Sequence, residues 1–106
     1  MDTHFVYVTV SGRAEAEKIA RALVSKHLAA CVNILPGMTS IYEWEGQILE
    51  DSEVALIAKT AREKVTNLID EVKALHSFAC PCIVSWPITG GHLEYIEWVS
   101  RQTRLS

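Results

Sequence analysis

The longest run of strand-like alternation lies in the middle of the chain, and it constrains the fold more than any other feature. It covers residues 28–59, LAACVNILPGMTSIYEWEGQILEDSEVALIAK, and shows no helical period. Alternate residues of an extended chain share one face, so this run carries two aromatic side chains on one side. That face consists of Met38, Ser40, Tyr42 and Trp44. The chain is expected to reverse at Gly46 and to return as a strand over residues 54–59.

The arms of this predicted hairpin are long for a chain of 106 residues. We expect them either to bend at Pro36-Gly37 or to extend beyond their own sheet. An arm that extends beyond its sheet exposes unpaired backbone edges, which favour pairing with another chain. The hairpin therefore points to assembly as well as to fold.

The flanking segments predict one strand and one helix before the hairpin, and a helix, a strand and a helix after it. Residues 5–10 are a continuous apolar run of strand length, and apolar residues at helical spacing follow from 16 to 28. Thr60-Ala61-Arg62-Glu63 has the pattern of a capping box and predicts the start of the next helix, whose apolar stripe runs over 65–75. The remaining elements are an edge strand over 83–88, interrupted by prolines, and a helix after Gly90-Gly91.

This order predicts one α+β domain over residues 1–106. Two split βαβ halves give a ferredoxin-like βαββαβ antiparallel sheet with both long helices on one face, plus a C-terminal helix. The other face of the sheet would be bare and partly apolar. Exposed apolar area of that size usually marks an interface, so we expect an oligomer.

Composition excludes several classes of function. The net charge is −3 and the basic residues are scattered, which argues against nucleic-acid binding. No apolar run approaches the roughly 20 residues that span a bilayer, and the start of the chain has no charged leader. With only three cysteines, reduced thiols fit better than a disulfide framework. We therefore expect a cytoplasmic protein without membrane contacts.

One short segment gathers metal-binding side chains. His76, Cys80 and Cys82 lie within seven residues, and thiolates with imidazole suit copper(I) or zinc. Cys80 and Cys82 share one face in an extended segment. The alternative is that both thiols only pack, because cysteine is among the most frequently buried residues.

Two further groups have weaker chemical signals. Cys31 sits between apolar residues without a local motif for a nucleophile and base, which favours packing. Aromatic and charged residues near the hairpin ends and on the last helix would suit a small ligand in a cleft, or equally a subunit contact. They are Trp44, Glu45, Lys59, Tyr95 and Trp98. No nucleotide-binding or zinc-protease motif is present, so no enzymatic activity is predicted.

The chain resembles the CutA family of divalent-cation tolerance proteins over roughly residues 5–103. The motifs that carry the resemblance are LAACVNILPG at 28–37, SIYEWEGQI at 40–48, the E-V-x-L-I-x-K-T run at 53–60, His76, and Tyr95-x-x-Trp98. The resemblance implies a ferredoxin-like protomer in a homotrimer whose hairpins pair between subunits, similar in architecture to the nitrogen-regulatory PII proteins. It implies copper binding and metal tolerance for bacterial members, anchoring of acetylcholinesterase for animal members, and no enzymatic reaction.

The resemblance also implies where metal ligands would lie. The copper ligands attributed to the enterobacterial relative correspond here to Val8, Leu75 and His76, so only the histidine is kept. Relatives usually continue H-P-Y-x-x-P-E after that position, where this chain has Phe78 and Cys82 in place of the phenol and the carboxylate. This exchange motivates the hypothesis of a thiophilic site at His76, Cys80 and Cys82.

These observations leave three functions open. The first is a trimeric metal-binding protein in metal homeostasis, with copper or another divalent ion as a non-obligatory ligand. The second is a PII-like sensor that binds a small metabolite in an inter-subunit cleft lined by Trp44, Lys59, Tyr95 and Trp98. The third is a structural trimer that docks a partner protein.

Overall fold

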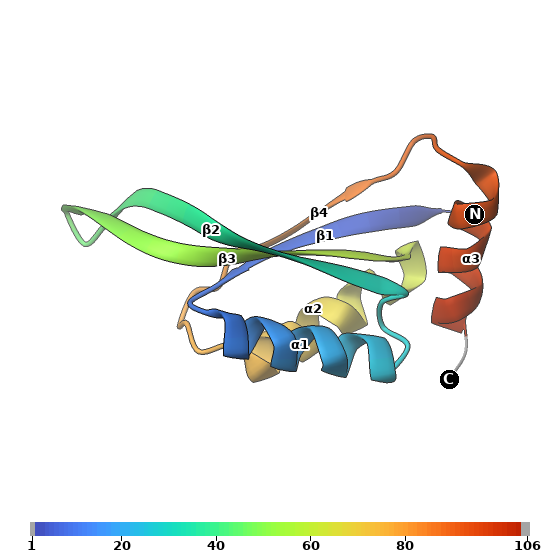
Figure 1. Cartoon of the computed structure of the whole chain (residues 1–106), viewed down its shortest axis with the longest axis horizontal. Helices are drawn as coiled ribbons and strands as arrows, with labels where there is room; N and C mark the ends of the chain where they lie inside the picture. Colours follow the sequence, from blue (N-terminus) through green and yellow to red (C-terminus); the bar gives the residue numbers. More distant parts are fainter. Residues whose placement is uncertain (1, 105–106) are drawn as a thin grey trace.

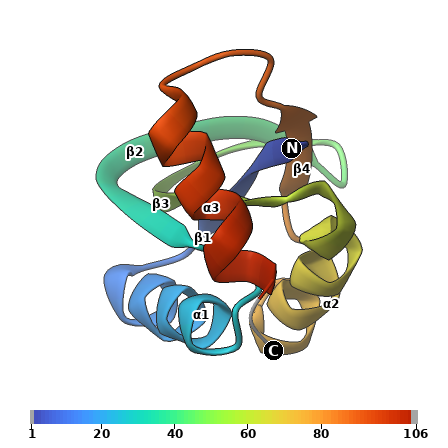
Figure 2. The ribbon, with the colours of Figure 1, turned by 90° about the vertical axis from the view of Figure 1, so that its right-hand side faces the viewer.

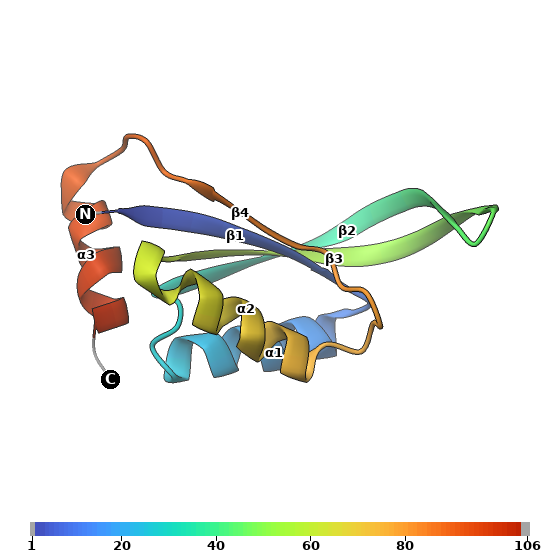
Figure 3. The same cartoon turned by 180° about the vertical axis from the view of Figure 1, so that it is seen from behind.

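The computed structural model describes residues 2–104, which form one antiparallel sheet and three α-helices. The elements, in chain order, are β1 (Thr3–Val10), α1 (Arg13–Ser25), β2 (Cys31–Trp44), β3 (Gln47–Ala61), a 3₁₀ turn (Arg62–Lys64), α2 (Val65–Leu75), β4 (Ile83–Pro87) and α3 (Leu93–Arg104). The strand order is β2-β3-β1-β4, and α1 and α2 cover the same face of the sheet (Figures 1 and 3). The predicted α+β architecture is confirmed.

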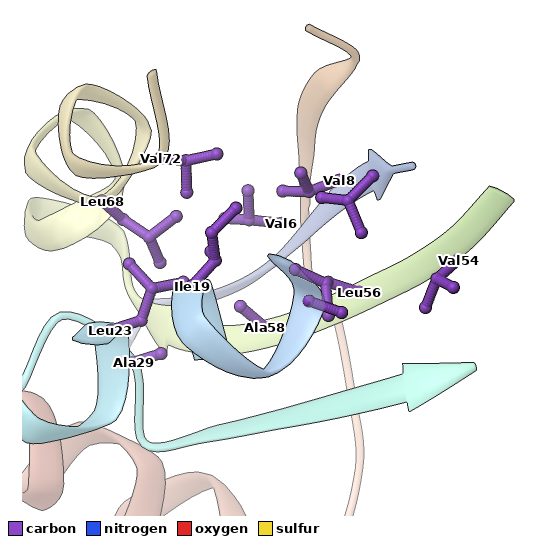
Figure 4. Packing of buried hydrophobic residues seen from close by; sticks show 12 residues of the cluster. Val6, Val8, Ile19, Leu23, Ala29, Val54, Leu56, Ala58, Leu68 and Val72 are labelled. Carbon is purple, nitrogen blue, oxygen red and sulfur yellow. The ribbon is translucent and has the colours of Figure 1, made fainter. Parts of the chain in front are cut away.

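The core lies between this face and the two helices (Figure 4). Alternate residues of β1 point into it, and their partners across the β1–β3 ladder face the same way. Both helices contribute one apolar stripe each, as the spacing predicts. The side chains that fill this layer include Val6, Val8, Val10, Ile19, Leu23, Leu56, Leu68 and Val72.

The opposite face of the sheet, called here the open face, is covered by neither α1 nor α2. The β1, β3 and β4 registers place Phe5, Lys59 and Trp86 side by side on it. Helix α3 stands across one end of the sheet (Figures 1 and 2) and contacts β3 and β1. Leu35, Val84 and Trp86 are exposed on this face. The predicted bare, partly apolar face is therefore present in the protomer.

The β2–β3 hairpin extends well beyond the rest of the sheet, as Figure 1 shows. β1 ends where Val10 pairs with Val54, so residues 38–53 pair only with one another. We call this part the hairpin arm. Its two-residue turn has left-handed backbone at Glu45 (φ 51°) and Gly46 (φ 82°), which suits a tight reversal. The predicted bend is also present, since the β2–β3 register shifts between Leu35 and Met38, where Gly37 has φ 81°.

Two local predictions were wrong. The capping box at Thr60-Ala61-Arg62-Glu63 does not form, because Thr60 still belongs to β3 and its hydroxyl donates to the carbonyl oxygen of Leu28 at 2.6 Å. A 3₁₀ turn precedes α2, and the α2 N-cap, Lys64, makes no side-chain capping bond. The first helix ends at Ser25 rather than continuing to Leu28, since His27 adopts φ 59°. None of the helices formed by residues 2–104 is long and apolar enough to cross a membrane.

Candidate functional site

A groove lies on the open face between the hairpin arm and the loop of residues 76–82, called here the thiol loop. Its volume is about 750 Å³. The lining side chains are aromatic, hydroxylic, acidic and thiol-bearing, and none of those that the structure describes is basic. They are Tyr7, Thr9, Ser40, Tyr42, Trp44, Asp51, Glu53, Ser77, Phe78, Ala79, Cys80 and Cys82. A cavity with this lining suits a cation.

The arm supplies the acidic wall. Ser40 pairs with Asp51 across the strands, and both point to the open face. Hydrogen bonds run along the diagonals: the Ser40 hydroxyl donates to Glu53 at 2.6 Å, and the Tyr42 hydroxyl donates to Asp51. The bond to Asp51 raises the pKa of the Tyr42 hydroxyl. Glu53 is only 9% exposed, so its carboxylate is held in place beside the groove.

The thiol loop is fixed at both ends. At its start, the Glu15 carboxylate accepts bonds from the Ser77 backbone N–H at 2.8 Å and from the Ser77 hydroxyl at 3.0 Å. At its end, the Thr9 N–H donates to the Cys82 carbonyl at 3.4 Å, just before β4 pairs with β1. Cys80 lies between these anchors and Cys82 is the second of them, and both are exposed free thiols. The fold therefore presents two thiols from a held segment.

His76 takes a structural position in this loop. Its side chain is fully buried, and Nε2 lies 2.7 Å from the Thr9 carbonyl oxygen. Nδ1 accepts the Phe78 N–H at 3.1 Å and lies 3.8 Å from Glu15. These two bonds assign the tautomer that carries its proton on Nε2. Neither ring nitrogen is available to a metal ion in this arrangement.

The structure therefore brings Cys80 and Cys82 to one groove but does not add His76 to them. Within residues 2–104, no three or more His, Cys, Asp or Glu side chains are grouped so that they could hold a metal ion. The positions that the resemblance assigns to copper do not fit either. Val8 lies in the core with 1% exposure and Leu75 packs against that core.

A second polar group lies at the opposite end of the open face. Lys59 sits between Cys31 and Phe5 in the sheet, and its ammonium group donates to Asn33 and lies 3.8 Å from the Cys31 sulfur. Burial and the nearby Cys31 sulfur raise the pKa of the Tyr95 hydroxyl. The Tyr95 and Trp98 rings lie 5.6 Å apart on α3.

The four predicted cleft residues do not meet within one protomer. Lys59, Tyr95 and Trp98 belong to this end of the sheet, whereas Trp44 closes the hairpin arm opposite Gln47. Lys59 is twelve positions after Gln47 along β3, which is about 40 Å of extended chain. Glu45 lies in the tight turn itself. A cleft that unites these residues requires a second copy of the chain, so it stays a prediction.

The acidic wall is absent from the predictions made on sequence alone. Strand alternation places Ser40, Tyr42 and Trp44 on one face, but Asp51 and Glu53 join them only when the pairing is extended across the turn. The signal was present, because a two-residue reversal at Glu45-Gly46 fixes which residues lie opposite each other. Tyr7 could not be added in this way, since its place in the groove depends on β1 packing beside the hairpin.

A family model described as CutA1 divalent ion tolerance protein matches residues 4–102. The chain belongs to the CutA family. The divalent-cation tolerance protein CutA of Thermus thermophilus is 47% identical over 98 residues, which cover 92% of this chain and 95% of that protein. The chloroplastic CutA protein of Arabidopsis thaliana is 46% identical over 99 residues, or 93% of this chain. The chain spans only 54% of that plant protein.

Solved CutA structures share the fold. CutA1 from Oryza sativa matches with a TM-score of 0.96 at 42% sequence identity, covering 100% of this chain and 97% of that one. The family model and the Oryza sativa structure both match this chain over nearly its whole length. The CutA fold is thus common to this chain and these relatives.

Proposed function

We propose that this CutA protein is a homotrimer that binds copper or other divalent metal ions and takes part in metal homeostasis. The observation that carries the proposal is the groove, which combines two exposed thiols with the Asp51 and Glu53 carboxylates and has no basic side chain in its described lining. Thiolates and carboxylates are the ligand types of transition and divalent metals. The proposal assigns no enzymatic reaction to the chain.

The trimeric state is supported by the open face and the hairpin arm. Tyr42 and Trp44 are exposed on one face of the arm, and Ile41 and Ile48 are exposed on the other. Large apolar side chains exposed on both faces of one hairpin suggest an interaction surface. β2 is also an edge strand of 14 residues with an unpaired outer side. Association of hairpins between copies would cover the exposed apolar side chains of the arm and pair the free edge of β2.

Native mass spectrometry of the reduced protein tests assembly and metal binding together. Samples without metal, and with one equivalent per chain of copper(I), copper(II) or zinc(II), are compared. We expect a trimer that retains up to three ions. A protein that remains monomeric at micromolar concentration contradicts the trimer, and one that retains none of the three ions contradicts the metal function.

A second candidate function is binding of a small anionic metabolite near Lys59. The observation that favours it is the ammonium group of Lys59, which donates to Asn33 and lies next to Cys31, with the Tyr95 hydroxyl of α3 also near the Cys31 sulfur. Lys59→Ala is expected to abolish metabolite binding and to spare metal binding. A Lys59→Ala variant that loses metal binding but keeps metabolite binding contradicts the assignment of the two ligands to separate sites.

We place the protein in the cytosol as part of the same proposal, because its three cysteines are free thiols. Fractionation of cells that express the tagged protein tests this location. Recovery in a membrane-enclosed oxidising compartment contradicts it.

A further inference from the structure

The two thiols of the groove are separated by a single proline. Cys80 and Cys82 both line the groove and both are exposed, whereas Pro81 between them is half-buried. Residues 77–80 form bends and β4 begins only at Ile83, so the shared groove, rather than an extended backbone, shows that both side chains reach one place. Cα atoms two residues apart are at most about 7 Å from each other. Two cysteine side chains at that spacing can both reach one ion. Proline also restricts the backbone of the segment, which limits the entropy lost when the sulfurs are brought together.

We propose that Cys80 and Cys82 form a two-coordinate dithiolate site for copper(I), without His76. This inference rests on the proposed metal-binding function and names its ligands and its ion. The His76 imidazole is excluded because both ring nitrogens are engaged inside the protein, with Thr9 and Phe78. Soft thiolates favour copper(I), while zinc prefers four ligands in a closed tetrahedral site.

The anchors of the thiol loop support this site. Glu15 holds Ser77 on one side, and the Thr9 N–H holds Cys82 on the other. Part of the ordering cost is thereby met in the folded protein before the ion arrives. His76 contributes from behind as a positioning residue, since its bond to Thr9 fixes the start of the loop.

Copper(I) binding at two thiols changes the charge of the groove. Two neutral thiols lose two protons and gain one copper(I) ion, so the groove becomes more negative by one charge. The groups that face the thiols are Asp51 and Glu53 from β3, Tyr42 from β2 and Tyr7 from β1. The carboxylates lie outside any three-ligand cluster with the thiols in the described residues, so they act through their charge. Their charge opposes this step.

The site is tested by competition for copper(I) against bicinchoninate in the reduced, oxygen-free trimer. Cys80→Ser and Cys82→Ser are each expected to remove the step at one equivalent per chain, while Cys31→Ser, the matched control, keeps it. Asp51→Asn, which retains an acceptor for Tyr42, is expected to strengthen copper(I) binding roughly twofold by removing a like charge. Binding should strengthen as the pH rises, because two protons are released when the two sulfurs bind the ion.

These measurements can reject the Cys80–Cys82 site without rejecting the proposed metal-binding function. Copper(I) binding that survives the double variant Cys80→Ser/Cys82→Ser overturns the site and leaves the metal function in place. Weaker binding by Asp51→Asn identifies a carboxylate as a ligand and overturns two-coordinate binding. A wild-type trimer that takes up no metal ion overturns both proposals. Far-ultraviolet circular dichroism of each variant verifies folding, which serine at two exposed positions is not expected to disturb.

Discussion

His76 Nε2 lies 2.7 Å from the carbonyl oxygen of Thr9, although the two residues are 67 positions apart in the chain. The bond joins the residue after α2 to β1 beneath the thiol loop. Through this bond the histidine supports the groove from inside the protein and does not line it. Its role can be tested through stability.

Replacement of His76 by alanine is expected to lower the free energy of unfolding by about 2 to 4 kcal/mol. The variant loses two hydrogen bonds and leaves the Thr9 carbonyl without its side-chain donor. Urea denaturation measures the effect, and His92→Asn, at an exposed histidine, is the control. Equal stability of the two variants would show that the bonds of His76 contribute little.

The Glu15 carboxylate predicts a loss of stability in acid. Burial raises its pKa, but the bonds from the Ser77 backbone and from the Ser11 and Ser77 hydroxyls outweigh burial and leave the pKa below its usual value. A lowered pKa in the folded state means that the charged form stabilises the fold. This contribution is complete above about pH 4.5 and is lost as the pH falls through the folded pKa.

Glu15→Gln therefore tests the pH dependence directly. The variant is expected to be less stable than wild type near neutral pH, and the two unfolding curves should converge as the pH falls below the folded pKa. Urea titrations across that range provide the measurement. A constant difference at every pH would rule out titration of Glu15 as the source.

The hairpin turn predicts a glycine effect at one position and not at another. Gly46 has φ 82°, a backbone conformation that L-residues rarely adopt, although a Cβ there would meet no atom within 4 Å. Gly46→Ala is expected to cost about 1 to 2 kcal/mol through backbone strain. Gly90→Ala is the matched control, since its site is equally open and its φ is not left-handed. Thermal melting of both variants should shift only for Gly46.

The tryptophan of the arm predicts a contribution to assembly. Trp44 is 49% exposed in the protomer, and Val24 of α1, outside the hairpin arm, is 42% exposed. Trp44→Ala is expected to weaken the trimer by about 3 to 5 kcal/mol per protomer, as for an aromatic side chain buried at an interface. Val24→Ala should leave it unchanged. Sedimentation at a series of concentrations distinguishes the two, and an unaltered trimer in both would place Trp44 outside the interface.

Most of the fold could be predicted from local patterns in the sequence. Alternation located the hairpin, Gly46 its turn and Pro36-Gly37 its bend, because each depends on backbone chemistry within a few residues. The capping box failed for the opposite reason. Thr60 has the residue type for a cap, but its hydroxyl is used by Leu28 on the neighbouring segment, which no local pattern reveals.

The site was predicted less well, because its chemistry depends on distant partners. Cys80 and Cys82 were identified from ligand type and spacing, and they do share one groove. By ligand type and spacing, His76 is an equally good candidate for a metal ligand. Its engagement with Thr9 follows only from the packing of α2 against β1, so the sequence could not separate a metal ligand from a buried structural histidine.

The apolar side chains exposed on both faces of the hairpin arm also have a consequence for folding. Residues 38–53 are not covered by the protomer's own helices. A newly folded monomer is therefore expected to associate rapidly with other copies. Refolding from urea should then contain a slow phase whose rate increases with protein concentration. Dilution should lower the melting temperature. For this chain, the final step of folding would be an encounter between molecules.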